Sequence, residues 1–154
     1  RAEWTPAGPS SYELLSRSGA GLTPRPLRRI ASGGELSRVM LASKVVLGNA
    51  DGVDTLVFDE VDAGVGGSTA RALAGVLADL AATHQVIVVS HLAQVAVMAD
   101  KHYVVSKEPG DVPQTHLDEV TGEARTAEIA RMLSGDQSEA SLAHAKQMLE
   151  EVRG

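Results

Sequence analysis

Residues 55–67 read TLVFDEVDAGVGG, and this stretch decides the fold. A mostly apolar run over 55–58 ends in Asp59 and Glu60, and a glycine-rich segment follows. A short apolar run of this kind, closed by polar residues and glycines, is typical of a fully buried parallel strand. Ligands of parallel sheets bind beyond the carboxyl ends of the strands. The two carboxylates therefore mark a candidate site, although strand-end residues that merely cap the next loop would read the same way.

Further strands and helices follow in alternation. QVIVVS at 85–90 predicts a second buried strand, which ends at His91. Between the two strands, a helix after the glycines places four apolar residues on one face: Ala70, Leu73, Leu77 and Leu80. Another short helix precedes a predicted strand over 102–107. This alternation, with short connections, predicts an α/β fold with a mostly parallel, right-handed sheet flanked by helices.

Upstream, ASGGELSR at 31–38 opens a predicted helix that ends at Gly48-Asn49 and Asp51-Gly52. Its core face is predicted from helical spacing as Leu36, Val39, Met40 and Leu47, with the small Ser43. Serine is a favoured N-cap residue, so Ser32 can simply start the helix. The main-chain amides of a glycine-rich helix start can also bind an anion, because they point at the ligand and the helix dipole favours negative charge.

The two ends of the chain look different from the centre. The first thirty residues, with prolines at 6, 9, 24 and 26, predict an irregular β segment in which 11–16 forms an edge strand or hairpin arm. After 108 we expect an antiparallel edge strand near 114–120 and two helices, about 124–133 and 138–152. The predicted division of the single domain is thus 1–30, 31–108 and 109–154.

Composition limits the function classes. The 154 residues carry a net charge of −6 and 3% aromatic residues, which argues against a chain that coats nucleic acid or stacks bases over its surface. There is no cysteine, no HExxH-type histidine pair and no apolar run long enough to span a bilayer. We therefore expect no metal cage of protein ligands, no membrane contact and a cytoplasmic location. Because the chain begins with Arg, we expect a piece of a longer protein.

The order of these motifs resembles the ATP-binding-cassette (ABC) ATPases. In those proteins the signature motif, Walker B strand, D-loop and switch histidine follow one another in the same order and at similar spacing. Transporter cassettes continue from Asp-Glu into Pro-Thr, whereas here Val61-Asp62-Ala63-Gly64 follows. The chain therefore resembles the SMC-like branch, and within it a bacterial DNA repair family. The stretches that carry the resemblance are IASGGELSRVMLA (30–42), TLVFDEVDAGVGG (55–67), QVIVVSHLAQVAVMAD (85–100) and EIARMLSGDQSEASLAHAKQMLE (128–150).

The resemblance implies roles for individual residues. Asp59 would hold Mg²⁺ through water, Glu60 would be the general base, and His91 would contact the terminal phosphate of ATP. Asp62 and Gly64 would form the D-loop. The signature residues would bind the ATP held by a second head, in trans: Ser32, Gly33, Gly34 and Glu35. A lone histidine at a strand end is otherwise most often structural.

One motif is absent from the sequence. No GxxxxGK[ST] occurs, so the phosphate-binding P-loop and its lysine are missing. The resemblance then implies the C-terminal lobe of an ABC/SMC-type P-loop ATPase head, without its N-terminal Walker A lobe and coiled coil. ATP-dependent head dimerisation and ATP hydrolysis would drive DNA binding or bridging in double-strand break repair and recombination. The resemblance also implies a nucleoid-associated protein. We expect the fragment alone to be inactive.

Other interpretations stay open at the level of sequence. Arg25, Arg28, Arg29 and Arg38 either face DNA or a partner, or form solvated surface that pairs with acidic residues. A degenerate lobe could serve as a non-catalytic ABC-type scaffold. GGSTA at 66–70 approximates a nucleophile elbow, which would make Ser68, His91 and either Asp79 or Asp100 a serine hydrolase triad.

Overall fold

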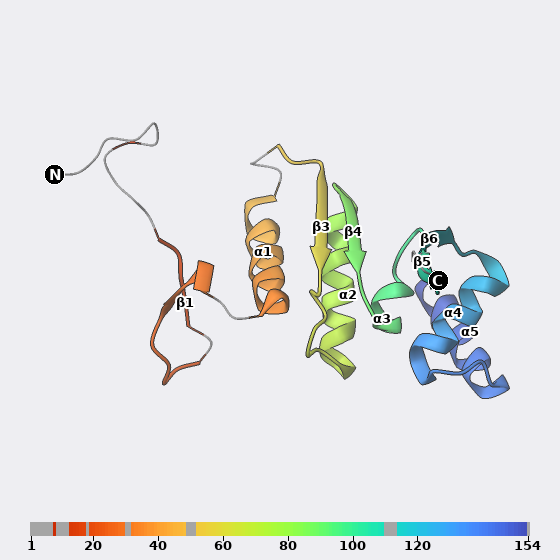
Figure 1. The fold of residues 1–154 in the computed structure, drawn as a ribbon. Helices are drawn as coiled ribbons and strands as arrows, with labels where there is room; N and C mark the ends of the chain where they lie inside the picture. The colour runs from red at the N-terminus through yellow and green to blue at the C-terminus, as the bar shows by residue number, and fades with distance from the viewer. Residues whose placement is uncertain are drawn as a thin grey trace.

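The computed structural model describes residues 8, 13–17, 19–29, 32–48, 52–109 and 114–153. The elements follow one another roughly in a row from the N- to the C-terminus (Figure 1). They are β1 (Leu15–Ser16), β2 (Arg25–Pro26), the 3₁₀ helix η1 (Leu27–Arg29), α1 (Gly33–Leu47), β3 (Thr55–Asp59), α2 (Gly67–Ala81), β4 (Gln85–Val89), α3 (Ala93–Ala96), β5 (Tyr103–Glu108), β6 (Gln114–Glu119), α4 (Gly122–Ser134) and α5 (Glu139–Arg153).

The predicted parallel pair is confirmed. β3 and β4 pair in parallel, with Thr55 opposite Gln85 and Asp59 opposite Val89. Because side chains alternate across a strand, Phe58 and its neighbours on one face pack against α2, where Leu77 and Leu80 are buried. The short loop after each strand therefore emerges at the same end of the sheet, and both predicted site segments lie there.

The prediction that these strands are buried on both faces is wrong. Val57, Ile87 and Val89 point away from α2 and are 65%, 47% and 58% exposed. α2 covers one face of the pair, and no described element covers the other (Figure 1). The continuous apolar sequence gives both faces of the strand pair side chains that suit a core. Within the described residues, only the face that packs against α2 is covered.

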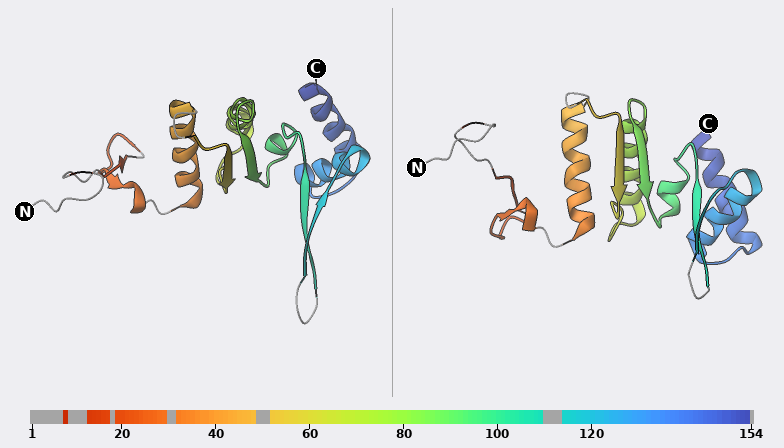
Figure 2. Two further views of the ribbon diagram at one scale, coloured as in Figure 1. Left: turned by 90° about the horizontal axis from the view of Figure 1, so that it is seen from above. Right: turned by 45° about the horizontal axis from the view of Figure 1, so that its top comes forward.

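The third predicted strand does not join the parallel pair. Among the described residues, β5 pairs only with β6, antiparallel and in continuous register from Tyr103–Glu119 to Glu108–Gln114. Both strands project as a ribbon from the rest of the chain (Figure 2). The physical reason is the polar composition of β6, which reads QTHLDE and is exposed along its whole length. Because β5 pairs with this polar strand, the two form a solvent-exposed antiparallel ribbon and not part of a covered sheet. The α/β class itself is confirmed.

α1 packs beside β3, but not through the predicted face. The buried positions of the helix are Gly34, Leu41 and Lys44. Of the predicted core face, Leu36, Met40 and Leu47 are exposed. The helix has two faces that suit packing, and periodicity alone could not tell which of them meets β3.

A second core cluster joins α3, α4 and α5. Ile129, Ala130 and Ala145 have no exposed surface and form its centre. Arg125 links α4 to the end of α3, because its Nη2 donates to the carbonyl oxygens of Ala96, the last residue of α3, and of Ala99, at 3.1 and 2.6 Å. The two predicted C-terminal helices are confirmed.

The N-terminal segment is irregular β structure in its described part, where β1 and β2 form a two-residue antiparallel pair. Positions 11 and 12 of the predicted strand, and 49 and 51 of the predicted helix end, lie outside the described residues. Within the described residues, no helix has the length and apolar character needed to cross a membrane.

Candidate functional site

The start of α1 is built by Ser32 and the two glycines. Ser32 is the N-cap, with extended backbone, and its Oγ accepts a hydrogen bond from the amide of Glu35 at 3.2 Å. Ser32, Gly33 and Glu35 are exposed, whereas Gly34 is buried. The positive end of the helix dipole therefore opens to solvent at Ser32 and Gly33, as an anion site requires, but Gly34 faces the protein.

The loop after β3 lies directly against this helix start, because α1 runs antiparallel to the strand. An ideal Cβ at Gly34 would lie 2.7 Å from the carbonyl oxygen of Glu60 and 2.8 Å from the Cβ of Ala63. An ideal Cβ at Gly33 would lie 2.8 Å from Oε2 of Glu60. Thus the predicted signature glycines and the predicted general base meet within one chain.

Asp59 and Glu60 end β3 as exposed carboxylates. The main chain of Asp59 is anchored, since its carbonyl oxygen accepts a hydrogen bond from Ser37 Oγ at 2.6 Å. Glu60 has φ 54°, a left-handed conformation that side chains other than glycine rarely adopt. Among the described residues neither carboxylate has a hydrogen-bond or ion-pair partner. Both are free to bind a ligand.

These carboxylates fit Mg²⁺ in a particular way. Within the described chain, no three His, Cys, Asp or Glu side chains gather as a metal-binding group. Mg²⁺ is often held by one or two carboxylates, several waters and the phosphates of a substrate. Asp59, exposed and unpaired beside Glu60, suits that kind of site and does not need further protein ligands.

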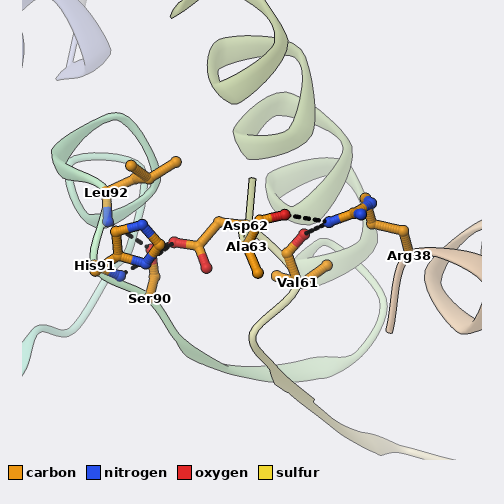
Figure 3. Close-up of polar contacts among 7 residues, drawn as sticks. All are labelled: Arg38, Val61, Asp62, Ala63, Ser90, His91 and Leu92. Atoms are coloured by element: carbon orange, nitrogen blue, oxygen red, sulfur yellow. Dashed lines mark hydrogen bonds and ion pairs between the residues drawn. The ribbon is translucent and has the colours of Figure 1, made fainter. Parts of the chain in front are cut away.

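Asp62 links the loops that follow the two parallel strands (Figure 3). It is 1% exposed, and its Oδ2 accepts hydrogen bonds from Ser90 Oγ at 2.5 Å and from the amide of His91 at 3.1 Å. Ser90 Oγ in turn accepts from the amide of Leu92 at 3.1 Å. His91 Nδ1 lies 3.4 Å from the same Oδ2, while 69% of the imidazole side chain is exposed. Asp62 therefore fixes the position of His91 and turns Nε2 away from the buried carboxylate.

The predicted arginine cluster is divided between different environments. Arg38 Nη1 donates to the carbonyl oxygens of Val61 and Ala63, at 3.1 and 2.9 Å (Figure 3). Arg28 is exposed and forms an ion pair of 2.6 Å with Glu13. Arg25 lies in β2 and Arg29 ends η1, where it is exposed. Only Arg38 belongs to the candidate site.

Sequence reasoning missed two of the contacts that assemble the site. The apolar pattern gives Ser90 only as the last residue of a predicted strand, and nothing in the periodicity of α1 distinguishes Ser37. The available signal for Ser37 was its place one helical turn after Gly34, on the side of α1 that meets β3. Gly64, predicted in the D-loop, has φ 71° and follows the loop held by Arg38.

The serine hydrolase interpretation does not match the geometry. Ser68 lies in the first turn of α2, and Asp79 lies near the end of the same helix. The carboxylate beside His91 is that of Asp62, and no hydrogen bond joins Ser68 to His91 in the described part of the chain. The nucleophile, base and orienting acid of a triad are therefore not assembled.

Comparison with known proteins identifies close relatives. The chain is 51% identical over 146 residues to the DNA repair protein RecN of Treponema pallidum, 47% identical over 150 residues to that of Streptomyces coelicolor and 52% identical over 149 residues to that of Deinococcus radiodurans. These matches cover 94%, 96% and 93% of this chain, but only 26% of each relative. The chain is homologous to a part of these proteins, as the resemblance of its motifs predicts.

The chain was also compared with family models and with solved structures. No family model matches the sequence. One solved structure, from work on ATP-driven dimerization and DNA-stimulated activation of SMC ATPases, is similar with a TM-score of 0.48 and 21% identity, over 88% of this chain and 69% of that one.

Proposed function

We propose that this chain, a homologue of about a quarter of a RecN protein, is the C-terminal lobe of an SMC-like ATPase head that acts in DNA double-strand break repair and recombination. ATP binding would join two heads, and ATP hydrolysis would release them. DNA binding or bridging would be coupled to this cycle. The nucleotide and Mg²⁺ are cofactors of the complete protein, which would be cytoplasmic.

One observation carries the proposal. The exposed start of α1, the two unpaired carboxylates and the exposed imidazole of His91 lie together at the carboxyl ends of β3 and β4, where ligands of parallel sheets bind. Asp62 connects these ends, since it binds Ser90 and His91. An anion site, a metal-binding carboxylate and a proton acceptor in one place suit phosphoryl transfer to water.

The site residues divide the work of hydrolysis. Mg²⁺, held by Asp59 through water, would neutralise charge that develops on the phosphates. Glu60 would accept a proton from the attacking water as its oxygen bonds to the γ-phosphorus and the bond from that phosphorus to the bridging oxygen breaks. His91 would donate from Nε2 to the γ-phosphate, because Nδ1 faces Asp62. ADP and phosphate are the products.

The signature residues would serve a different nucleotide. Ser32, Gly33 and Glu35 are exposed at the start of α1, so they can face ATP held by a second head. Gly34 would place the helix start correctly through its contact with Glu60 and Ala63. The D-loop residues Asp62 and Gly64 lie next to them. ATP would then be shared between two copies of the protein.

The missing P-loop would come from the N-terminal Walker A lobe of the same protein. Apolar side chains on the uncovered sheet face and on the outer face of α1 suit burial against another lobe, namely Val57, Ile87, Val89, Leu36 and Met40. The relatives are about four times longer than their matched part, which leaves length for such a lobe and a coiled coil. DNA would be bound mostly by those other parts, since this chain has a net charge of −6.

Replacing the general base tests the function. In the full-length protein, Glu60→Gln is expected to lower the rate of ATP hydrolysis by ~10²–10⁴ and to leave ATP affinity nearly unchanged, because only the proton acceptor is lost. Turnover is measured by phosphate release, ATP affinity with a fluorescent analogue and head association by light scattering. We expect the variant heads to stay associated in ATP.

Glu123→Gln provides the matched control, because Glu123 is an exposed glutamate in the first turn of α4, outside the site. It should turn over ATP like the wild type. Near-normal turnover of Glu60→Gln would refute the assigned base and favour the non-catalytic scaffold.

A further inference from the structure

Arg38 occupies the same face of α1 as Gly34, one turn further along the helix. Its partly buried guanidinium reaches back over the glycine, and Nη1 would lie 3.2 Å from a Cβ at that position. From there Nη1 donates to the carbonyl oxygens of Val61 and Ala63, at 3.1 and 2.9 Å. Within the described residues no carboxylate lies at ion-pair distance from it. The arginine is thus directed at its own main chain and not at solvent.

The turn that Arg38 holds needs such support. Glu60 enters it with φ 54°, a conformation that costs free energy in a residue with a side chain. Inside the turn the amide of Ala63 donates to the carbonyl oxygen of Glu60, and the amide of Val65 donates to that of Asp62, both at 3.0 Å. The two remaining carbonyl groups of the turn, those of Val61 and Ala63, accept hydrogen bonds from Arg38, which links the turn to α1.

The same turn is held on its opposite side by the residues that follow β4. The buried side chain of Asp62, within the turn, accepts hydrogen bonds from Ser90 Oγ and the amide of His91. Arg38 and Asp62 therefore act from opposite sides on a segment of four residues (Figure 3). Glu60 stands at the beginning of this segment, so its position depends on both contacts.

We infer that Arg38 is a positioning residue: by fixing the 60–63 turn on α1, it sets the placement of Glu60 beside the helix start and of Asp62 against His91. This interpretation replaces the sequence-based alternative that Arg38 contacts DNA. It deepens the proposed function, on which its kinetic consequence rests. Its structural consequence does not depend on any activity.

Hydrogen exchange of the full-length protein tests the structural consequence. Arg38→Met keeps the aliphatic packing and removes the donors, and we expect the amides of Ala63 and Val65 to exchange about tenfold faster as two hydrogen bonds are lost. Arg38→Lys keeps a cationic donor and should recover most of the protection. Arg71→Met, at an exposed arginine of α2, is the matched control and should change nothing. Unchanged exchange in Arg38→Met would overturn the inference; if that variant fails to fold, Arg38→Ala is measured in its place.

Kinetics separate positioning from DNA contact. We expect Arg38→Met to lower kcat for ATP hydrolysis by between about tenfold and 10²-fold, with KM for ATP and the salt dependence of DNA binding unchanged, because a displaced Glu60 affects chemistry and not binding. Arg38→Lys should restore much of kcat. A smaller salt slope for DNA binding with normal kcat would overturn the inference. If the wild-type protein itself lacks ATPase activity, the proposed function fails, and the exchange experiment still decides the role of Arg38.

Discussion

Gly34 fits its place only because it has no side chain. A Cβ there would lie 2.7 Å from a carbonyl oxygen and 2.8 Å from the methyl group of Ala63, which is closer than real Cβ atoms come to such neighbours. The carbonyl belongs to Glu60, whose main chain is already in a strained conformation. The backbone of α1 and the loop after β3 can therefore approach each other only at a glycine.

Gly34→Ala is expected to destabilise the protein by ~1–3 kcal/mol, because the added methyl group forces α1 away from the Glu60 carbonyl. Gly75→Ala is the matched control: Gly75 lies within α2, and a Cβ there would meet nothing within 4 Å. That substitution should stabilise by up to ~1 kcal/mol, since alanine is the better helix former. Urea unfolding measures both. An equal gain in stability for the two variants would contradict the packing described at Gly34.

The sequence locates the residues of the candidate site but not the contacts among them. Glu60 and His91 stand out because each follows an apolar run, and apolar runs mark where strands end. The contact of Asp62 with Ser90 joins residues 28 positions apart and depends on the register of β3 and β4. Periodicity gives no register between strands, so Ser90 could not be assigned. Arg38 is grouped by charge with three other arginines as a possible DNA or partner contact, whereas its hydrogen bonds to the carbonyls of the 60–63 turn depend on the close approach at Gly34.

The turn between α4 and α5 is organised around one carboxylate. Asp136 is exposed, and its Oδ1 accepts hydrogen bonds from three serine hydroxyls and one serine amide, contributed by Ser134, Ser138 and Ser141. Hydrogen bonds to the charged form, that from Ser141 foremost, lower the pKa of Asp136 to about 2 from its ordinary 3.8. The ionised carboxylate therefore stabilises this turn.

This pKa predicts an acid-dependent contribution to stability. Because the folded-state pKa is lowered, the contribution is fully present above about pH 4 and is lost as the pH falls toward 2. Asp136→Asn, which cannot ionise, should melt at a lower temperature than the wild type at pH 7, and the difference should shrink between pH 4 and 2. Thermal unfolding followed by circular dichroism measures it.

Ser141→Ala removes the strongest donor to Asp136 and should reproduce part of the same pH-dependent difference. A difference between Asp136→Asn and wild type that is constant from pH 7 to pH 2 would show that the carboxylate charge contributes nothing to the turn.

α1 and the parallel strands show where pattern reading reaches its limit. The elements themselves were predicted nearly to their ends. Their exposed faces were not, because an apolar stripe states only that a face suits burial and does not identify the element that buries it. In α1 the covered face contains Gly34 and Lys44 beside Leu41, and no hydrophobicity scale would select the glycine or the lysine. Gly34 is needed there because the close approach of the Glu60 carbonyl leaves no room for a side chain.

The described part of the chain exposes a large apolar surface. Among the described residues, no element covers the outer side of α1 or of the β3–β4 pair, and Val57, Ile87 and Val89 are exposed on the sheet face. Extended exposed apolar patches mark interaction sites. Under the proposed function, this surface meets the Walker A lobe.

We expect residues 1–154 alone to hydrolyse no ATP and to gain activity when mixed with the remaining part of the full-length protein. Val57→Asp should lower this restored activity by about tenfold or more, because an unpaired carboxylate would be buried between the lobes. The matched control is Leu117→Asp, since Leu117 on β6 is 65% exposed, as Val57 is, but lies on the projecting ribbon. Phosphate release measures both variants.

Robust hydrolysis by the fragment alone would contradict the split head. Equal activity of the Val57→Asp and Leu117→Asp mixtures would place the lobe contact elsewhere. Circular dichroism of each variant before mixing confirms that the outward-facing substitutions leave the fold intact.

The packing at Gly34 and the capping by Ser32 also bear on how sequences with these motifs are compared. Both residues stabilise the fold of a single chain, Gly34 by close packing and Ser32 by capping α1. A homologue that no longer binds a nucleotide would therefore still need them. Asp59 and Glu60 differ, because the side chains of neither have a partner among the described residues. Under the proposed function, a comparison that separates active from inactive sequences should therefore give more weight to Asp59 and Glu60 than to the signature residues Ser32, Gly33 and Gly34.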